Sequence, residues 1–210
     1  MCLPRVPNLP VRSLRMTQEL DPKVPAPVTL TTDRLILRPT TEADADAFAA
    51  LNADPIVMRH YPQTYDRASS DASLGRMRAH FERRGFGMWT AETIDARAVI
   101  GMIGMQVPRF EAHFTPCVEV GWRLFPKFWG KGYATEGARA ALHFGFHTLG
   151  LPEIVAMTTP GNRKSIAVME RLGMTRDPAD DFDNPLVEGP LKHHILYRLR
   201  APQDSPRTQI

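Results

Sequence analysis

Cysteine is scarce in this sequence: two, Cys2 and Cys117, occur among 210 residues. Two thiols cannot build a disulfide framework or a metal cage, which excludes a small fold held by disulfides and a cysteine-bound metal centre. Cys117 stands in an apolar run, so it is interpreted as a small core residue rather than a nucleophile. Low cysteine use fits a reducing compartment, and we expect a cytoplasmic protein with no metal.

Long apolar runs and a strong charge excess are missing too. No stretch approaches the roughly 20 apolar residues that a membrane-spanning helix needs, and there is no internal repeat. The net charge of +3, from 26 basic and 23 acidic side chains, is too small to indicate nucleic-acid binding. We therefore expect neither a membrane nor a nucleic acid as partner, although a slightly basic protein suits an anionic small ligand.

What the sequence does hold is the material for one domain over residues 28–200, because an apolar content of 43% can supply a full core. Residues 1–27 hold six prolines and no period of 2 or 3.6, which predicts a flexible tail without the apolar core of a secretory signal. Residues 1–15 could be an over-long start before Met16, which the intact mass of the natively expressed protein would reveal. Residues 201–210 are polar and should fray.

Apolar periodicity predicts alternating strands and helices within this domain. Strands are expected over residues 30–37, 86–92, 98–107, 117–125, 153–159 and 193–199. Helices are expected over residues 41–52, 66–84, 132–149 and 164–172, with a proline-punctuated loop between the first two. This order implies a mixed α/β (α+β) sheet.

A glycine-rich turn lies between the strand-like run 117–125 and the helix-like run 132–149. Gly130 and Gly132 permit a tight turn and a close approach of the backbone to a ligand. The unpaired N–H groups of the first helical turn and the helix dipole favour an anion there. Lys127 and Lys131 add two cations, so a phosphate or pyrophosphate is the expected occupant.

Two common phosphate-binding motifs do not fit this turn. A nucleoside-triphosphate loop needs Gly-x-x-x-x-Gly-Lys-Ser/Thr, but Phe125 stands where the first glycine belongs and Gly132 follows Lys131. A dinucleotide-binding turn needs Gly-x-Gly-x-x-Gly, and Thr135 stands where its third glycine belongs. Both ligand classes are therefore disfavoured.

A third motif fits. Lys127-x-x-Gly130-x-Gly132-x-Ala134 resembles the Arg/Gln-x-x-Gly-x-Gly/Ala pyrophosphate loop of the GCN5-related N-acetyltransferases (GNAT), with Lys in the first position. Residues 119–124 look like the fourth strand of that family, and residues 162–174 like its Asn-x-x-Ser/Ala…Leu-Gly-Phe/Met motif. Residues 30–39 look like the opening strand of the ribosomal-protein (RimJ/RimL-like) branch.

The resemblance covers about residues 28–200 and implies the GNAT fold, a mixed, mostly antiparallel sheet of six to seven strands flanked by about four helices. It also implies acetyl-CoA as co-substrate and direct attack by an amine in a ternary complex. The expected pyrophosphate cradle is the row of backbone N–H groups on Phe128, Trp129, Gly130, Lys131, Gly132, Tyr133 and Ala134. Lys127 and Lys131 could assist it, or could be ordinary solvated charges.

Two further cofactor contacts follow from the same resemblance. The backbone N–H groups of Arg123, Leu124 and Phe125 should face the pantetheine and the acetyl carbonyl, because the fourth strand of this family splays from the fifth. Asn162 should contact the pantetheine amides, to which its own amide can both donate and accept. Asn162 is equally suited to cap the helix that follows, and both roles can hold together.

Glu119 is the candidate base, because a carboxylate in an apolar strand is costly without a partner or a function. The alternative is a structural salt bridge, for example with Arg123 on the same strand face. Met169 stands where many family members carry a tyrosine acid, and methionine cannot donate a proton. Ser165 is a weak candidate for that acid, and a thiolate, whose thiol has a pKa of about 8.5, can leave without much help.

The acceptor groove of this fold would lie between residues 58–65 and 177–194. Four aspartates in the second segment, at positions 177, 180, 181 and 183, could attract a cationic amine or could belong to an ordinary solvated loop. His193 and His194 begin the last strand, so at most one can point into the site, and a core or rim position is expected for it.

The sequence thus predicts an N-acetyltransferase acting on a primary amine, either a protein N-terminus or a small molecule. A non-catalytic acyl-CoA-binding or sensing module is the alternative, which the absent tyrosine favours and Glu119 opposes. Transfer of a longer acyl group and a homodimer both stay open.

Overall fold

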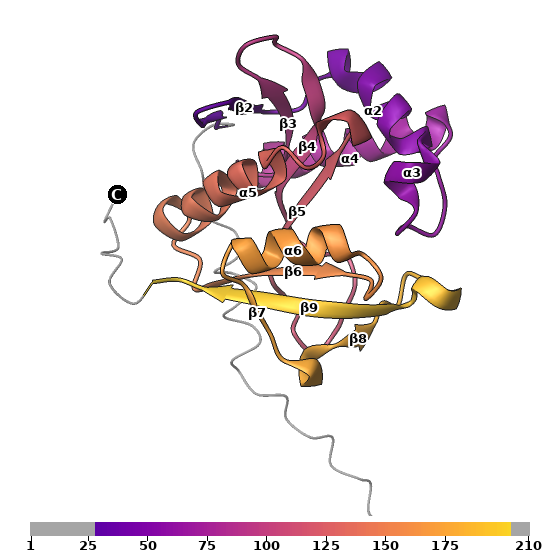
Figure 1. The fold of residues 1–210 in the computed structure, drawn as a ribbon, viewed down its shortest axis with the longest axis vertical. Coiled ribbons are helices and arrows are strands. Elements are labelled where there is room, and N and C mark those ends of the chain that lie inside the picture. Colours follow the sequence, from indigo (N-terminus) through magenta and orange to yellow (C-terminus); the bar gives the residue numbers. More distant parts are fainter. Residues whose placement is uncertain (1–27, 203–210) are drawn as a thin grey trace, which may run out of the picture.

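The computed structural model describes residues 28–202 (Figure 1), and these form one sheet covered by helices. Its strands are β1 (Leu30–Thr31), β2 (Leu35–Arg38), β3 (Met88–Thr93), β4 (Val99–Gln106), β5 (Glu119–Leu124), β6 (Glu153–Thr158), β7 (Thr175–Arg176), β8 (Phe182–Asp183) and β9 (His193–Arg200). Their spatial order is β1-β2-β3-β4-β5-β6-β9-β7, and β8 pairs with β9. All pairs are antiparallel except β5 with β6, which confirms the predicted mixed, mostly antiparallel α/β fold.

The described residues form nine strands, more than the six or seven expected, because β1, β7 and β8 hold two residues each. The strand predicted over residues 30–37 is in fact a hairpin. The N–H of Thr32 donates to the carbonyl of Leu35 at 2.9 Å, so that Leu30 comes to lie opposite Leu37. No glycine or proline marks this turn in the sequence, and the alternation therefore reads as continuous.

The four predicted helices are confirmed within the described residues, and a short fifth is added. The helices are α2 (Ala45–Ala53), α3 (Pro55–Met58), α4 (Arg67–Arg84), α5 (Tyr133–His143) and α6 (Arg163–Arg171). Helix α3 lies in the segment predicted as a loop, where the Asp54 carboxylate accepts from the N–H of Ile56 at 2.8 Å and caps a single turn. A π-helical turn, Phe144–Thr148, continues α5 almost to its predicted end.

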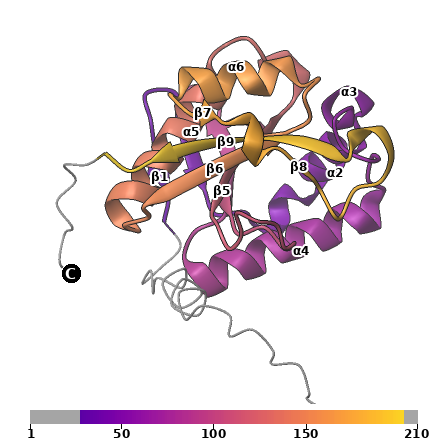
Figure 2. The same ribbon diagram turned by 90° about the horizontal axis from the view of Figure 1, so that it is seen from below.

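Helices cover both faces of the sheet. Figure 2 shows α5 and α6 on one side and α4 on the other. The side with α5 buries Trp89, Ile103, Val120, Ala138 and Ala141 among others. A Cβ on Gly137 would lie 2.5 Å from the Cδ1 of Ile103, so glycine is what allows α5 to rest directly on β4.

On the opposite face, α2, α3 and α4 pack against the sheet through a smaller apolar cluster. Its buried members are Phe48, Leu51, Val57, Leu74, Met88 and Met102. The side chain of Met102 on β4 therefore lies on the sheet face that packs against α4.

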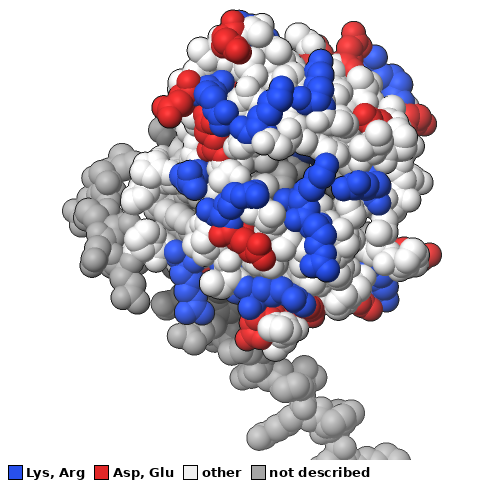
Figure 3. All heavy atoms as spheres, viewed as in Figure 1, with Lys and Arg blue, Asp and Glu red and all other residues white. Residues whose placement is uncertain are grey.

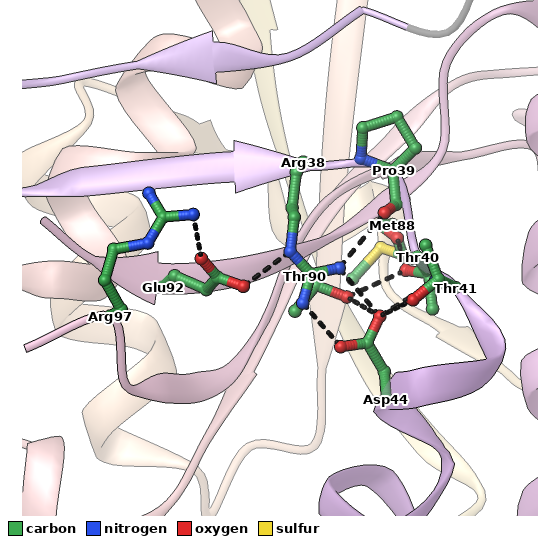
Figure 4. A network of polar contacts seen from close by, with 9 residues as sticks. All are labelled: Arg38, Pro39, Thr40, Thr41, Asp44, Met88, Thr90, Glu92 and Arg97. Atoms are coloured by element: carbon green, nitrogen blue, oxygen red, sulfur yellow. Dashed lines mark hydrogen bonds and ion pairs between the residues drawn. The ribbon is translucent and has the colours of Figure 1, made fainter.

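A buried polar network ties β2 and β3 to the start of α2 (Figure 4). Asp44 is 2% exposed, and its two carboxylate oxygens accept from both Nη atoms of Arg38, at 2.6 and 2.8 Å. The Nε of Arg38 donates to Glu92 at 2.5 Å, and Arg97 pairs with the second Glu92 oxygen at 3.2 Å. Asp44 forms a capping box with Thr41 at the start of a helical turn. Its contacts with Arg38 and Thr90 also connect that turn to β2 and β3.

Over residues 28–202, none of the helices combines the length and the apolar character needed to cross a membrane. The tails predicted at residues 1–27 and 201–210 lie outside the described residues, apart from Ala201 and Pro202.

Candidate active site

A cavity of about 1570 Å³ opens where β5 and β6 separate. These parallel strands share one register pair, Glu119 with Val155, beside a 2.9 Å hydrogen bond from the Val155 N–H to the Val118 carbonyl. Beyond that point the two strands diverge, as Figure 1 shows. The gap leaves the remaining length of β5 without a partner on that side, so its backbone borders the cavity.

The open edge of β5 offers fewer N–H groups than the sequence predicts. The Phe125 N–H donates to the Ile100 carbonyl of the preceding strand region at 3.0 Å, so the expectation that it faces a cofactor is wrong. Antiparallel alternation directs the N–H of Arg123 to β4 in the same way and that of Leu124 into the gap. The Trp129 indole donates to the Leu124 carbonyl at 2.7 Å, which agrees with a Leu124 peptide edge that points away from β4.

The turn after β5 also uses two of the N–H groups assigned to the pyrophosphate cradle. Phe128 donates to the carbonyl of Phe125 at 2.9 Å, and Trp129 donates to that of Pro126 at 3.0 Å. These bonds form a short 3₁₀ turn, Pro126–Phe128, whose side chains but not its N–H groups can meet a ligand. The row of open N–H groups, predicted to begin at Phe128, therefore begins at Gly130.

From Gly130 to Thr135, the backbone N–H groups have no acceptor among the described residues. The first bond inside α5 runs from the Glu136 N–H to the Gly132 carbonyl at 3.0 Å. Gly130 and Gly132 adopt φ of 74° and 84°, left-handed conformations that favour glycine. Both glycines, together with Tyr133, Ala134 and Thr135, line the cavity. The row of open donors at the start of α5 thus has the geometry that suits an anion.

Arg34 braces this turn from the β1–β2 hairpin, a role that the sequence did not reveal. Its Nη1 donates to the Lys131 carbonyl at 3.0 Å, and its Nε donates to a Glu136 oxygen at 2.6 Å. Its guanidinium lies 4.6 Å from the centre of the Tyr133 ring. The pair is separated by about a hundred positions along the chain, so no local pattern could have announced it.

The two turn lysines lie outside the cavity. Their Nζ atoms are 5.1 Å (Lys127) and 5.7 Å (Lys131) from the Phe128 ring, and both side chains are exposed. Lys164 of α6 lines the cavity instead, with its Nζ 4.1 Å from the Trp129 ring. Figure 3 shows Lys and Arg side chains gathered on the face where α5 and α6 lie.

Asn162 caps α6, as its alternative role predicted. Its Oδ1 accepts from the Ser165 N–H at 3.3 Å, and its Nδ2 donates to the Thr158 hydroxyl at 2.9 Å. Asn162 and Ser165 both line the cavity. The amide is therefore held in a fixed orientation at the cavity wall, with one donor and one acceptor position left for a ligand.

Glu119 lies half-buried at the start of β5 and lines the same cavity. Burial raises the pKa of its carboxyl above the ordinary value, against a partly opposing hydrogen bond from the Gln106 amide. Arg123, its predicted alternative partner, instead donates to the Asn52 side chain and lies 4.1 Å from the Tyr61 ring centre. Among the described residues no cation pairs with Glu119, which contradicts the salt-bridge interpretation.

Glu119 faces the α4 side of the sheet. It stands opposite Gln106, as Arg123 stands opposite Met102, and residues two and four apart on a strand share a face. Met102 packs with Leu74 of α4 on that face. The cavity therefore joins the open N–H row at the start of α5 to a carboxylate on the α4 side of the sheet.

Met169, which occupies the position where the resemblance led us to expect a tyrosine acid, is 2% exposed and lines the cavity. Two tyrosines, Tyr61 and Tyr65, line it from residues 58–65, one of the two segments predicted to border the acceptor groove. That prediction named the segment and no role for either tyrosine.

His60, in the same segment, bridges the cavity wall from the α3 side to the end of β6. Its Nε2 accepts from the Arg59 Nε at 3.1 Å, which leaves its Nδ1 to donate to the Thr159 hydroxyl at 3.0 Å. Burial, with the nearby Arg59 charge, lowers the pKa of His60 and keeps the ring neutral.

Residues 177–194 line the cavity as predicted, through Asn184, Leu186, Val187, Leu191 and His194, but their aspartates are paired elsewhere. Asp180 pairs with Arg198 at 2.7 Å, Asp181 pairs with Arg176, and Asp183 lies 3.6 Å from Lys192. None of these aspartates lines the cavity. The interpretation as an ordinary loop is the correct one. His194 reaches the cavity lining and His193 does not, which agrees with the expectation that at most one would.

Comparisons with known proteins agree with this geometry. A family model described as an acetyltransferase (GNAT) domain matches residues 34–175. FsC-acetyl coenzyme A-N(2)-transacetylase of Aspergillus fumigatus is 33% identical over 184 residues, covering 82% of this chain and 77% of that protein. [Ribosomal protein uS5]-alanine N-acetyltransferase of Escherichia coli is 27% identical over 194 residues, covering 85% and 94%.

A solved acetyltransferase from Agrobacterium tumefaciens shares 33% identity and a TM-score of 0.68, covering 82% of this chain and 94% of that chain. The family match spans the open turn, β5 and α6, and both the fold and the sequence motifs agree with it. The protein is an N-acetyltransferase, and the chain belongs to the GNAT acetyltransferase family, whose members use acetyl-CoA.

Proposed function

We propose that the protein transfers the acetyl group of acetyl-CoA to a primary amine by direct attack in a ternary complex, with Glu119 as the base. One observation carries this proposal: a single cavity connects the open N–H row of α5 with the half-buried Glu119 through the gap between β5 and β6. A binding module would need the first feature but not the second.

The residues on the α5 and α6 side fit coenzyme A. The N–H groups from Gly130 to Thr135 suit a pyrophosphate, and Arg163, Lys164 and Arg171 of α6 line the same side and suit further phosphate. Leu124 offers an N–H to a carbonyl in the gap, and Asn162 offers its amide to the pantetheine. Bound acetyl-CoA supplies the thioester whose acetyl group is transferred and the thiolate that leaves.

Glu119 accepts the proton of the acceptor ammonium, directly or through one water. Its raised pKa brings the carboxylate closer in basicity to the amine that it must deprotonate. No acid is required on the other side, because a thiol with a pKa of about 8.5 is a competent leaving group. Ser165 is the hydroxyl of α6 that lines the cavity and stays the weak candidate for that proton.

The acceptor is a primary amine, on a protein N-terminus or a small molecule. The names of two relatives span this range, since one acts on an alanine of ribosomal protein uS5 and one is an N(2)-transacetylase.

The test is a thermal-shift series with acetyl-CoA, CoA, ATP and NADH, followed by thiol release from acetyl-CoA with a panel of amines. We expect the two CoA species alone to raise Tm, since a ligand that binds only the native state stabilises it by mass action. A rise with ATP or NADH instead, or none with CoA, would show that the α5 site serves another ligand.

Gly132→Ala should weaken CoA binding by about 10-fold, because an alanine in a left-handed conformation costs about 1–2 kcal/mol and would shift the turn. Gly150 is a matched control: its φ of 65° is also left-handed, its surroundings are open, and it lies outside the cavity. Calorimetric titration should show that Gly150→Ala leaves the CoA Kd unchanged. Equal Kd values for both variants would contradict the proposed pyrophosphate site.

A further inference from the structure

Arginines line the part of the cavity that lies beyond Glu119. Arg76 and Arg83 come from α4, and Arg109 comes from the connection between β4 and β5. On α4 they share one face with Ser73 and His80, at the helical spacings of three and four that place side chains in a row. This row belongs to the α4 side of the sheet, opposite the α6 cations assigned to the cofactor (Figure 2).

The charge of this row is not balanced within the part of the chain that the structure describes. Glu119 is the one carboxylate among the cavity-lining residues there. Arg76, Arg83 and Arg109 are exposed at the cavity rim and have no hydrogen bond or ion pair with a described residue, whereas two arginines of α4 that lie outside the cavity do. Arg67 pairs with Asp46 and Asp71, and Arg78 pairs with Glu42.

Three cavity-lining arginines without a described acid partner, Arg76, Arg83 and Arg109, favour an anionic occupant. The occupant of this side cannot be the pyrophosphate, because the open N–H row of α5 lies across the sheet. It is the side that Glu119 faces, and therefore the side from which an amine must approach the base.

Building on the proposed function, we propose that the preferred acceptor carries a carboxylate near its reacting amine, and that Arg76, Arg83 and Arg109 select for it. The ammonium would lie at Glu119 and the carboxylate over α4. An acceptor with several positive charges would be repelled by the same arginines. A small amino acid and an N-terminal peptide with acidic residues both carry this chemistry.

Three peptides with the same first residue, Ala-Asp-Glu-Phe, Ala-Asn-Gln-Phe and Ala-Lys-Arg-Phe, test the selection, and L-glutamate against its diamide, which lacks both carboxylates, tests the small-molecule source. We expect kcat/KM at low salt to be about 10-fold higher for the acidic peptide than for the basic one, and the ratio to shrink as salt screens exposed charges. A higher rate with L-glutamate than with any peptide would assign the small-molecule source.

Arg76→Gln and Arg83→Gln should each lower kcat/KM for the acidic acceptor by about 3-fold, through KM, with the neutral peptide unaffected. Arg139→Gln is the matched control, since Arg139 is exposed on α5 and lies outside this cavity. CoA binding, followed by thermal shift, should be unchanged in all three variants.

The outcomes separate the two proposals. Equal or better use of the basic peptide, or no loss in the arginine variants, would overturn the acceptor inference and leave the proposed function intact. Absence of both CoA binding and acetylation of every acceptor would overturn the proposed function and the inference with it.

Discussion

Glu119→Gln should lower kcat/KM by about 10²- to 10⁴-fold, the range over which a positioned base contributes to catalysis. The substitution conserves the size of the side chain, and its amide oxygen can still accept the hydrogen bond from Gln106. An amide cannot take a proton from the acceptor amine, so the chemical step alone should suffer. The CoA Kd should stay within error of the unaltered protein, because the open N–H row lies on α5.

Glu82→Gln provides the matched control, because Glu82 is an exposed carboxylate of α4 that lies outside the cavity. Steady-state rates with one amine acceptor at saturating acetyl-CoA make the comparison. If Glu119→Gln keeps turnover within about 3-fold of the unaltered protein, far less than general-base loss predicts, Glu119 is not the base.

The raised pKa of Glu119 predicts how kcat/KM should depend on pH. Burial raises that pKa in the folded protein, so the acid limb of kcat/KM should fall above the ordinary glutamate range near about pH 4.3 and vanish in Glu119→Gln. The folded state then binds the proton more tightly than the unfolded state. Stability contributed by Glu119 is therefore present at low pH and is lost as pH rises through the folded pKa.

It follows that Glu119→Gln should be at least as stable as the unaltered protein at pH 7, despite its lost activity. Urea unfolding at pH 5 and pH 8 checks the sign: the stability advantage of the variant should grow with pH. A variant that is both inactive and strongly destabilised at pH 8 would instead indicate a structural role for the carboxylate.

The glycine turn with open N–H groups could be predicted from sequence because its signal is local. Gly130 and Gly132 supply the two left-handed residues, and the helix that follows supplies the open donors. Spacing alone excluded the other phosphate-binding turns. The sequence could not show which N–H groups of that turn stay open. The 3₁₀ turn that uses the Phe128 and Trp129 N–H groups has no characteristic residue pattern.

Contacts between distant segments explain the remaining differences. The brace of Arg34 on Glu136, and the pairing of Asp180 with Arg198, depend on which strands become neighbours. For the same reason the sequence left open whether the aspartates of residues 177–183 attract an amine or belong to an ordinary loop, and it gave no sign that Arg76 and Arg83 lack a described acid partner. A charge count along the chain cannot tell paired from unpaired side chains.

Asp44→Asn should destabilise the fold by about 3–5 kcal/mol, the range for removing one partner of a buried ion pair. The substitution leaves the Arg38 guanidinium, 24% exposed, without the carboxylate that receives both of its Nη atoms. It also weakens the acceptor for the Thr41 N–H and for the Thr90 hydroxyl (Figure 4). Urea unfolding at pH 7 measures the loss, which corresponds to roughly 10 °C in Tm for a domain of this size.

Asp46→Asn is the matched control, because Asp46 is 90% exposed in the next helical turn and its ion pair with Arg67 lies at the surface. It should change stability by less than about 1 kcal/mol. Equal losses at positions 44 and 46 would contradict the buried network as the anchor of β2 to α2.

The effect at Asp44 should also depend on pH, with a known sign. Burial opposes ionisation, but hydrogen bonds from Arg38 and the Thr41 N–H outweigh it and hold the pKa of Asp44 below its ordinary value. The unfolded state then binds the proton more tightly, so the stability from Asp44 is full above about pH 4, the unfolded aspartate value, and is lost as pH falls through the folded pKa. The gap between the unaltered protein and Asp44→Asn should therefore stay constant from pH 8 to pH 5 and narrow below pH 4. A gap that instead narrowed as pH rose would assign the loss to packing around the amide rather than to the missing charge.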